Sequence, residues 1–152
     1  MTTVNFVTVA RSIAQIDLRS RGIYTANTDN VPVNAISVCP AWIPKAADFI
    51  STLNASRKSF GAQGTEKMDI EYDMTWQYFH TPVGQVLTLQ EFTSLLDNLA
   101  YIIEQMSDND QPTNSVDMKF AGIKTIGIVA DAANNQYFGA EVILRITEFI
   151  NG

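Results

Sequence analysis

Apolar residues recur at helical spacing at the start of the chain. The first twenty residues place apolar side chains three to four positions apart and fill the positions between them with polar residues. Because an α-helix repeats about every 3.6 residues, this spacing gathers the apolar side chains on one face. They are Phe6, Val9 or Ala10, Ile13 and Ile16. The pattern therefore predicts an amphipathic helix that ends near Gly22.

A second, longer helix is predicted over residues 89–106. Thr88 stands three residues before Glu91, which is the spacing of a capping box at a helix start. We expect this helix to bury its apolar face, with Leu96 among the inward-facing residues. The apolar residues at helical intervals are Leu89, Phe92, Leu95, Leu96, Leu99, Ile102, Ile103 and Met106.

Strict alternation of apolar and polar residues predicts a strand between residues 68 and 78. Successive side chains of a strand point to opposite faces, so this strand has one buried face and one wet face. The strand ends before Pro82 and Gly84, and Trp76 is expected to point inward. The apolar side carries Met68, Ile70, Tyr72, Met74, Trp76 and Tyr78, and the polar side carries Asp69, Glu71, Asp73, Thr75 and Gln77.

Shorter stretches predict further strands. The apolar run at residues 35–38 is bracketed by prolines and turn-forming residues, as is typical of a short strand between loops. Alternation resumes at residues 116–120. Two closing strands, near 123–130 and 137–149, flank the turn-prone residues 133–136 and so predict a hairpin.

A long polar loop is predicted near residues 45–66. It contains a possible short amphipathic piece around Phe49 and Leu53, followed by a polar stretch with Gly61 and Gly64. Loops of that length in a small domain are commonly functional or disordered. A charged pair beside an exposed aromatic residue suits a protein contact, so Arg57, Lys58 and Phe60 are candidates for contacting a partner. A plain mobile loop is the alternative.

The order of elements is helix, strands, helix, strands. This order predicts an α+β fold with a largely antiparallel sheet and two main helices packed on one face. The chain has 152 residues, which is the size of one domain, and we expect residues 1–152 to form one.

Composition and charge narrow the possible functions. Charged residues make up 17% of the chain, below the roughly 25% of typical soluble domains, which hints that other subunits cover part of the surface. The net charge of −6 and the scattered Lys and Arg residues argue against ordinary duplex DNA or RNA binding. No stretch has the pattern of a signal peptide or a membrane span, so we expect a soluble protein.

The sequence offers little for catalysis. Cys39 is the only cysteine and His80 the only histidine, and neither lies in a catalytic signature. The segment GAQGTEK lacks the terminal GK[ST] of a phosphate-binding loop. We therefore expect no enzymatic activity and no cofactor.

Two groups of acidic residues are candidate metal ligands. Asp69, Glu71 and Asp73 share one side of a strand, yet neighbours along a strand face lie about 7 Å apart, and one ion needs ligands from several elements. Asp108 and Asp110 resemble the start of a calcium loop but lack its Gly and distant Glu. A solvated acidic face and a polar turn are the favoured interpretations, and no metal site is expected.

The layout as a whole resembles a known family. It combines an N-terminal amphipathic helix, a Pro-rich strand segment (VPVNAISVCPAWIP), a polar loop, an alternating strand, a central helix and a closing hairpin, YFGAEVILRITEF. In order of elements this resembles the tail terminator proteins of long-tailed bacteriophages and related neck and tail-completion proteins. The similarity is one of pattern over nearly the whole chain.

The resemblance implies a virion structural protein. Such proteins form a ring, typically a hexamer, on the last tier of the tail tube, where they end tube polymerisation and meet the head-closure or connector protein. The chain would then reside in the tail or neck of the virion and assemble in the host cytoplasm. DNA would pass through the ring without specific binding, and the candidates for acidic channel surface are Asp69, Glu71, Asp73, Asp108 and Asp110.

Two alternatives remain open at this point. A head–tail connector, a neck adaptor, or a baseplate or other tail component would share the same pattern. A small enzyme is the alternative from a different class, and it is disfavoured because His80 and Cys39 lack supporting motifs.

Overall fold

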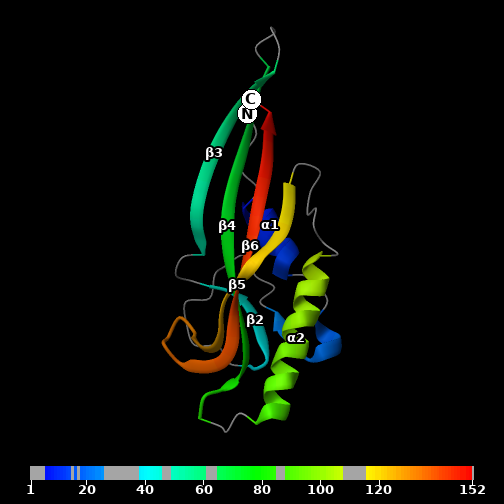
Figure 1. Ribbon diagram of the computed structural model, residues 1–152, viewed down its shortest axis with the longest axis vertical. Coiled ribbons are helices and arrows are strands. Elements are labelled where there is room, and N and C mark those ends of the chain that lie inside the picture. The colour runs from blue at the N-terminus through cyan, green and yellow to red at the C-terminus, as the bar shows by residue number, and fades with distance from the viewer. Residues whose placement is uncertain are drawn as a thin grey trace.

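The protein is an α+β structure built on one mixed sheet, as predicted (Figure 1). The computed structural model describes residues 6–14, 16, 18–25, 38–45, 49–60, 65–84, 88–107 and 116–151. The helices are α1 (Phe6–Ala14) and α2 (Leu89–Ser107), and η1 (Arg19–Arg21) is a single 3-10 turn. The strands are β1 (Tyr24–Thr25), β2 (Ala41–Pro44), β3 (Ile50–Phe60), β4 (Thr65–Pro82), β5 (Val116–Ala130) and β6 (Gln136–Asn151).

The long strand β4 organises the sheet. β6 pairs with β4 along almost its whole length, and β5 pairs with the far edge of β6. On the other edge of β4, β3 pairs with the first half of the strand and β2 with the second half. All these pairings are antiparallel, and only the short β1 runs parallel to its neighbour β2. The sheet is therefore largely antiparallel, as the sequence predicted.

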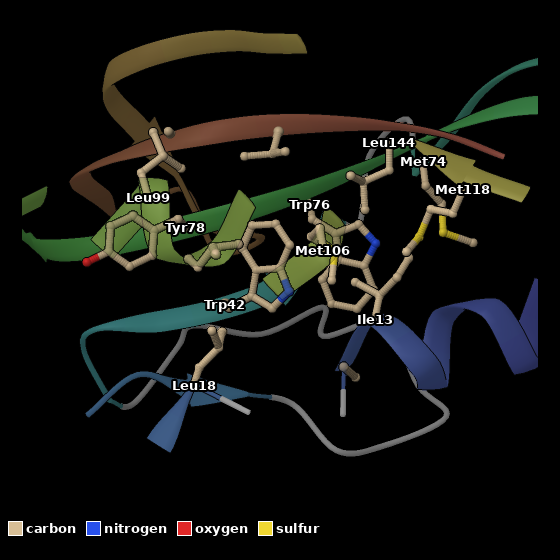
Figure 2. Close-up of a cluster of buried hydrophobic side chains, with 14 of the residues drawn as sticks. Ile13, Leu18, Trp42, Met74, Trp76, Tyr78, Leu99, Met106, Met118 and Leu144 are labelled. Carbon is tan, nitrogen blue, oxygen red and sulfur yellow. The ribbon is translucent and has the colours of Figure 1, made fainter. Parts of the chain in front are cut away.

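Both helices pack on one face of the sheet, here called the inner face. The apolar side of β4 is buried as predicted, at Tyr72, Met74, Trp76 and Tyr78. The expected wet side is exposed only in part, because Thr75 and Gln77 are also buried. Trp42 of β2 stacks on Trp76 with ring centroids 5.5 Å apart. Figure 2 shows these side chains meeting residues from both helices. The helices contribute Val9, Ile13, Leu95, Leu99, Ile102 and Met106.

A smaller apolar cluster lies on the opposite face of the sheet, here called the outer face. Phe79 packs edge-on against Tyr137 with ring centroids 5.0 Å apart. Ala41, Ile43 and Val129 complete the cluster. Because Phe79 directly follows Tyr78 in β4, this end of the strand is buried on both faces.

The closing hairpin and the central helix confirm their sequence signals. At the helix start, the backbone N–H of Glu91 donates to Thr88 Oγ1 over 3.1 Å. In the hairpin turn, Asp131 Oδ1 accepts hydrogen bonds from the backbone N–H groups of Ala133 and Asn135. Asn134 takes the left-handed conformation that such turns favour, with φ at 67°.

The predicted long loop is largely a strand, which corrects the expectation for residues 45–66. β3 spans Ile50–Phe60, and β4 begins at Thr65 rather than Met68. A strand at the edge of a sheet is held by backbone hydrogen bonds to one neighbour, so it can form without the apolar alternation that marks a buried strand. The polar composition of this segment therefore reflects its place at the edge.

The Pro-rich segment also differs from the prediction. Ala35, Ile36 and Ser37 lie outside the described residues, and Val38 lies in a bend. The strand of this region is β2, which is buried at all four positions. Pro44 ends it, where the missing N–H of proline removes no interior ladder bond.

Two other element boundaries differ from the prediction. The first helix ends at Ala14, and Gly22 instead follows η1 with φ at 67°, where the N–H of Ile23 donates to the carbonyl of Leu18. The strands expected at 116–120 and 123–130 form the single strand β5. Its register shifts between Phe120 and Gly122 and again between Ile123 and Thr125, which breaks the alternation that a regular strand would show.

The prediction that Leu96 of α2 faces inward is wrong by one position. Leu96 is 38% exposed, whereas its neighbour Leu95 is fully buried. Adjacent helical residues lie about 100° apart, so only one of the two leucines can point directly at the sheet. Trp76 is buried, as predicted.

These faces predict unequal costs for truncating the two leucines. Trp76→Ala and Leu95→Ala should each lower the free energy of unfolding by about 2–5 kcal/mol, because they leave cavities in the core. Leu96→Ala should cost about 1 kcal/mol or less, because its side chain already meets solvent. Urea denaturation of the three variants measures the difference. Equal losses at Leu95 and Leu96 would contradict the assigned faces.

Candidate functional site

Asp69, Glu71 and Asp73 of β4, here called the acidic row, lie on the outer face beside a basic residue of β6. Arg145 of β6 sits directly opposite Asp73. Its Nε donates to Asp73 Oδ1 over 3.0 Å, a second guanidinium nitrogen reaches Oδ2 at 3.4 Å, and Glu71 Oε1 lies 3.9 Å from Nε. The hydrogen bonds and charge of Asp73 raise the pKa of Arg145. This forked pairing neutralises part of the acidic row.

A second ion pair lies on the same face. Lys45 Nζ is 2.7 Å from Glu141 Oε2. The described residues contain no group of three His, Cys, Asp or Glu side chains that could hold a metal ion. Asp108 and Asp110 lie outside the described residues. Of the five candidates for acidic channel surface, the structure thus places Asp69, Glu71 and Asp73 together on one strand face.

The predicted contact residues lie on β3 instead of a loop tip. Arg57, Lys58 and Phe60 pair with Met68, Lys67 and Thr65 of β4. They belong to the outermost part of a β-hairpin, which Figure 1 shows projecting beyond the helices. Their role in binding a partner stays a prediction.

Cys39 and His80 have separate environments. Cys39 packs against the small cluster on the outer face, where burial and then the charge of Asp131 raise the pKa of its thiol. A raised thiol pKa lowers the fraction of the nucleophilic thiolate. Neither observation favours a Cys–His catalytic pair.

His80 instead belongs to a chain of hydrogen bonds between β4 and α2. Asn98 Nδ2 donates to the Tyr78 hydroxyl oxygen over 2.9 Å. The Tyr78 hydroxyl can then donate to His80 Nδ1 at 2.7 Å, and His80 Nε2 lies 3.3 Å from Glu91 Oε2.

The order of hydroxyl, imidazole and carboxylate in this series of hydrogen bonds resembles a catalytic arrangement, but the hydroxyl is not accessible. Tyr78 is fully buried, and burial raises the pKa of its phenol above the usual range. A buried, neutral hydroxyl that already has two partners cannot serve as an accessible nucleophile. These hydrogen bonds therefore hold α2 against the sheet.

A buried carboxyl group forms another link that the sequence interpretation missed. The Tyr72 hydroxyl donates to Glu148 Oε2 over 2.7 Å, and both side chains are buried on the inner face. Burial, followed by the hydrogen bond and charge of Glu148, raises the pKa of the Tyr72 phenol. The sequence indicates this burial, because Glu148 continues the alternation of the buried residues Ala140, Val142, Leu144 and Ile146.

Exposed apolar side chains gather on β5 and α2. Among the described strands, β5 pairs only with β6, so its other edge has no strand partner. Phe120, Ile126 and Ile128 of β5 are exposed, as are Leu89 and Leu96 of α2. Exposed apolar groups beside a free strand edge are typical of a protein interface.

Comparisons with known proteins add no family. No protein-family model matches the chain, and no curated protein matches it. Within the described residues, neither helix is both long enough and apolar enough to cross a membrane.

The Tyr72–Glu148 link predicts a measurable loss of stability. Tyr72→Phe removes the hydroxyl that donates a hydrogen bond to a buried carboxyl oxygen of Glu148. The free energy of unfolding should therefore fall by about 1–3 kcal/mol at neutral pH. Chemical denaturation measures this change. Tyr24→Phe, at an exposed tyrosine, is the matched control and should have little effect.

The variant should also change the response to alkaline pH. Because the folded state raises the pKa of the Tyr72 phenol, the unfolded chain releases this proton first, and stability falls as the pH rises above about 10. Tyr72→Phe should lose less stability over that range than the wild-type protein. An identical decline in both would contradict the link.

Proposed function

We propose that the protein is a virion structural component that forms a ring, of about six copies, at the end of a bacteriophage tail tube. In this role it would end tube polymerisation and join the tail to the head-closure protein. The proposal rests on the family-like order of elements, the low charge content and one feature of the fold. That feature is a sheet whose two edge strands, β3 and β5, each have one strand partner among the described residues and so leave one edge unpaired there.

The two free edges carry the argument for a ring. Across the upper part of the sheet the order is β3, β4, β6, β5, and neighbouring strands are antiparallel. With four alternating strands, the two edge strands point in opposite directions. Copies related by rotation about an axis parallel to the strands can therefore join edge to edge with the antiparallel order unbroken. Such a heterologous contact closes into a ring when the rotation closes.

Catalysis is the disfavoured alternative. Cys39 and His80 have separate environments, Tyr78 is buried, and the acidic row is partly neutralised by Arg145. A neck adaptor or another tail component remains the alternative within the same class, and only the location in the virion separates it from a terminator.

Imaging of the purified protein tests the proposal. We expect closed rings in negative stain, and rings at one end of the tubes when the protein is mixed with tail tubes. Sedimentation velocity should give a mass of about six chains, each of 16.8 kDa. A protein that stays a single chain and is absent from purified virions would refute the proposal. Rings that attach to the connector but not to tubes would favour the neck adaptor.

DNA should pass the ring without binding. Six copies carry a formal charge of about −36, although exposed charges more than about 8–10 Å apart are largely screened at physiological salt. Local charge therefore decides whether the ring binds DNA. Filter binding with duplex DNA at about 50 and 200 mM salt measures this affinity. We expect no micromolar binding at either concentration. Tight binding that weakens steeply with salt would reveal a basic surface and a DNA-gripping role.

A further inference from the structure

The edge of the sheet opposite β5 is formed by two different strands. In the upper part, along residues 65–74 of β4, the edge strand is β3. In the lower part, along residues 76–79 of β4, β2 takes the same position, and β1 pairs with the far edge of β2. The lower edge therefore lies one strand further out than the upper edge. Two copies that approach edge to edge meet first at β1 and the lower part of β5.

Two register rows cross the lower part of the sheet from β1 to β5. Paired residues of neighbouring strands point to the same face, so each row stays on one face. The inner-face row is Thr25, Trp42, Tyr78, Ala140 and Ile126, and the outer-face row is Tyr24, Ala41, Phe79, Gly139 and Gly127. The three middle residues of each row are buried. The β1 end and the β5 end of the sheet therefore lie at the same level.

Large apolar side chains are exposed at both ends of these rows. Tyr24 is 51% exposed and Ile126 is 46% exposed, and Ile128, two residues further along β5, is 53% exposed. Gly127 leaves space on the outer face, because a Cβ there would meet no atom within 4 Å. An aromatic ring on a neighbouring strand can cover such an edge glycine. One edge thus carries a tyrosine at the level where the other edge has room for its ring.

We infer that the lower part of β5 of one copy pairs antiparallel with β1 of the next copy. The inference rests on the proposed ring and names its contact. On the inner face this register places Ile126 beside Thr25, and it places Ile128 beside Ile23, a buried core residue that directly precedes β1. On the outer face it places Tyr24 over Gly127. The contact also gives the free edge of β5 the backbone donors and acceptors of a strand.

Strand direction permits this contact between copies. β1 and β2 run antiparallel to β4, whereas β5 is antiparallel to β6 and so runs in the direction of β4. A copy related by rotation about an axis parallel to the strands therefore brings β1 antiparallel to β5. A two-fold contact between two β5 strands would leave Tyr24 exposed in both copies. The head-to-tail contact covers the exposed groups of both edges.

A cysteine pair tests the contact directly. Thr25→Cys and Ile126→Cys are introduced together into a Cys39→Ser chain. Within one copy the two positions are four strand spacings apart, about 19 Å, which is too far for a disulfide. Across the contact they are directly opposed, with Cβ atoms about 4.5–5.5 Å apart. Mild oxidation should give a ladder of covalent oligomers on a non-reducing gel that ends at the size of the ring.

The control pair is Thr25→Cys with Phe120→Cys in the same Cys39→Ser chain. Phe120 lies on the same strand and the same face as Ile126, but it is level with Met74 and therefore with β3. About four strand residues, or about 13 Å, separate its level from that of Thr25. The control pair should give no ladder.

Glutamate variants at the same two positions give a second measurement. Ile126→Glu should raise the concentration needed for assembly at least tenfold in sedimentation velocity, because it buries a charge at every contact. Phe120→Glu should assemble like the wild-type protein. Far-UV circular dichroism checks that both variants fold, and Ile126→Ser with Phe120→Ser replaces the pair if either does not.

The outcomes separate this contact from the ring itself. Wild-type rings without a ladder from the cysteines at Thr25 and Ile126 overturn the contact and leave the ring proposal intact. Equal ladders from both cysteine pairs also overturn it, because the crosslinks then report no single register. Assembly that is lost in Phe120→Glu but normal in Ile126→Glu overturns it as well, because the copies then meet at β3. A wild-type protein that remains a single chain at every concentration overturns both proposals.

Discussion

The antiparallel ladder between β4 and β6 is the constraint on which the rest of the structure depends. It runs from Lys67 and Asn151 at one end to Pro82 and Tyr137 at the other, and it sets the inner face on both strands. Every other strand of the sheet except β1 pairs with β4 or β6. The close approach of the two strands requires Gly139, because a Cβ there would collide with the carbonyl oxygen of Tyr78. A side chain at this position would shift the ladder just where both faces are buried.

Polar groups on the inner face tie the apolar layer together at separate points of the ladder. Tyr72 serves the buried Glu148, and Tyr78 connects to α2 through Asn98 and His80. A buried polar group without a partner costs more than a hydrogen bond gains, so these links restrict how the layers can pack. They fix the rotation of α2 over the sheet. That rotation leaves Leu96 outside the core of a single copy.

The fold was predictable where one residue period dominates. β4 alternates strictly and α2 follows a helical repeat, so both were found from the sequence, as was the closing hairpin. β3 was missed because an edge strand needs only backbone pairing, and β2 was misplaced because its prolines resemble loop residues. The candidate site was less predictable. Asp73 and Arg145 are 72 residues apart in the chain, and only the register of β4 and β6 brings them together.

The outer face gives the proposed ring its electrostatic character. No helix covers this face among the described residues, so in a ring of continuous sheets it is the side along which a duplex could move. The pairing of Arg145 with Asp73 and of Lys45 with Glu141 cancels charge locally. The same face also carries Lys119, which pairs with Arg145 in register, and the register positions of Lys58 and Lys67, so bases and carboxylates are interspersed on it. Phosphates would therefore meet charges of both signs, with part of the positive charge already paired, which favours passage over tight binding.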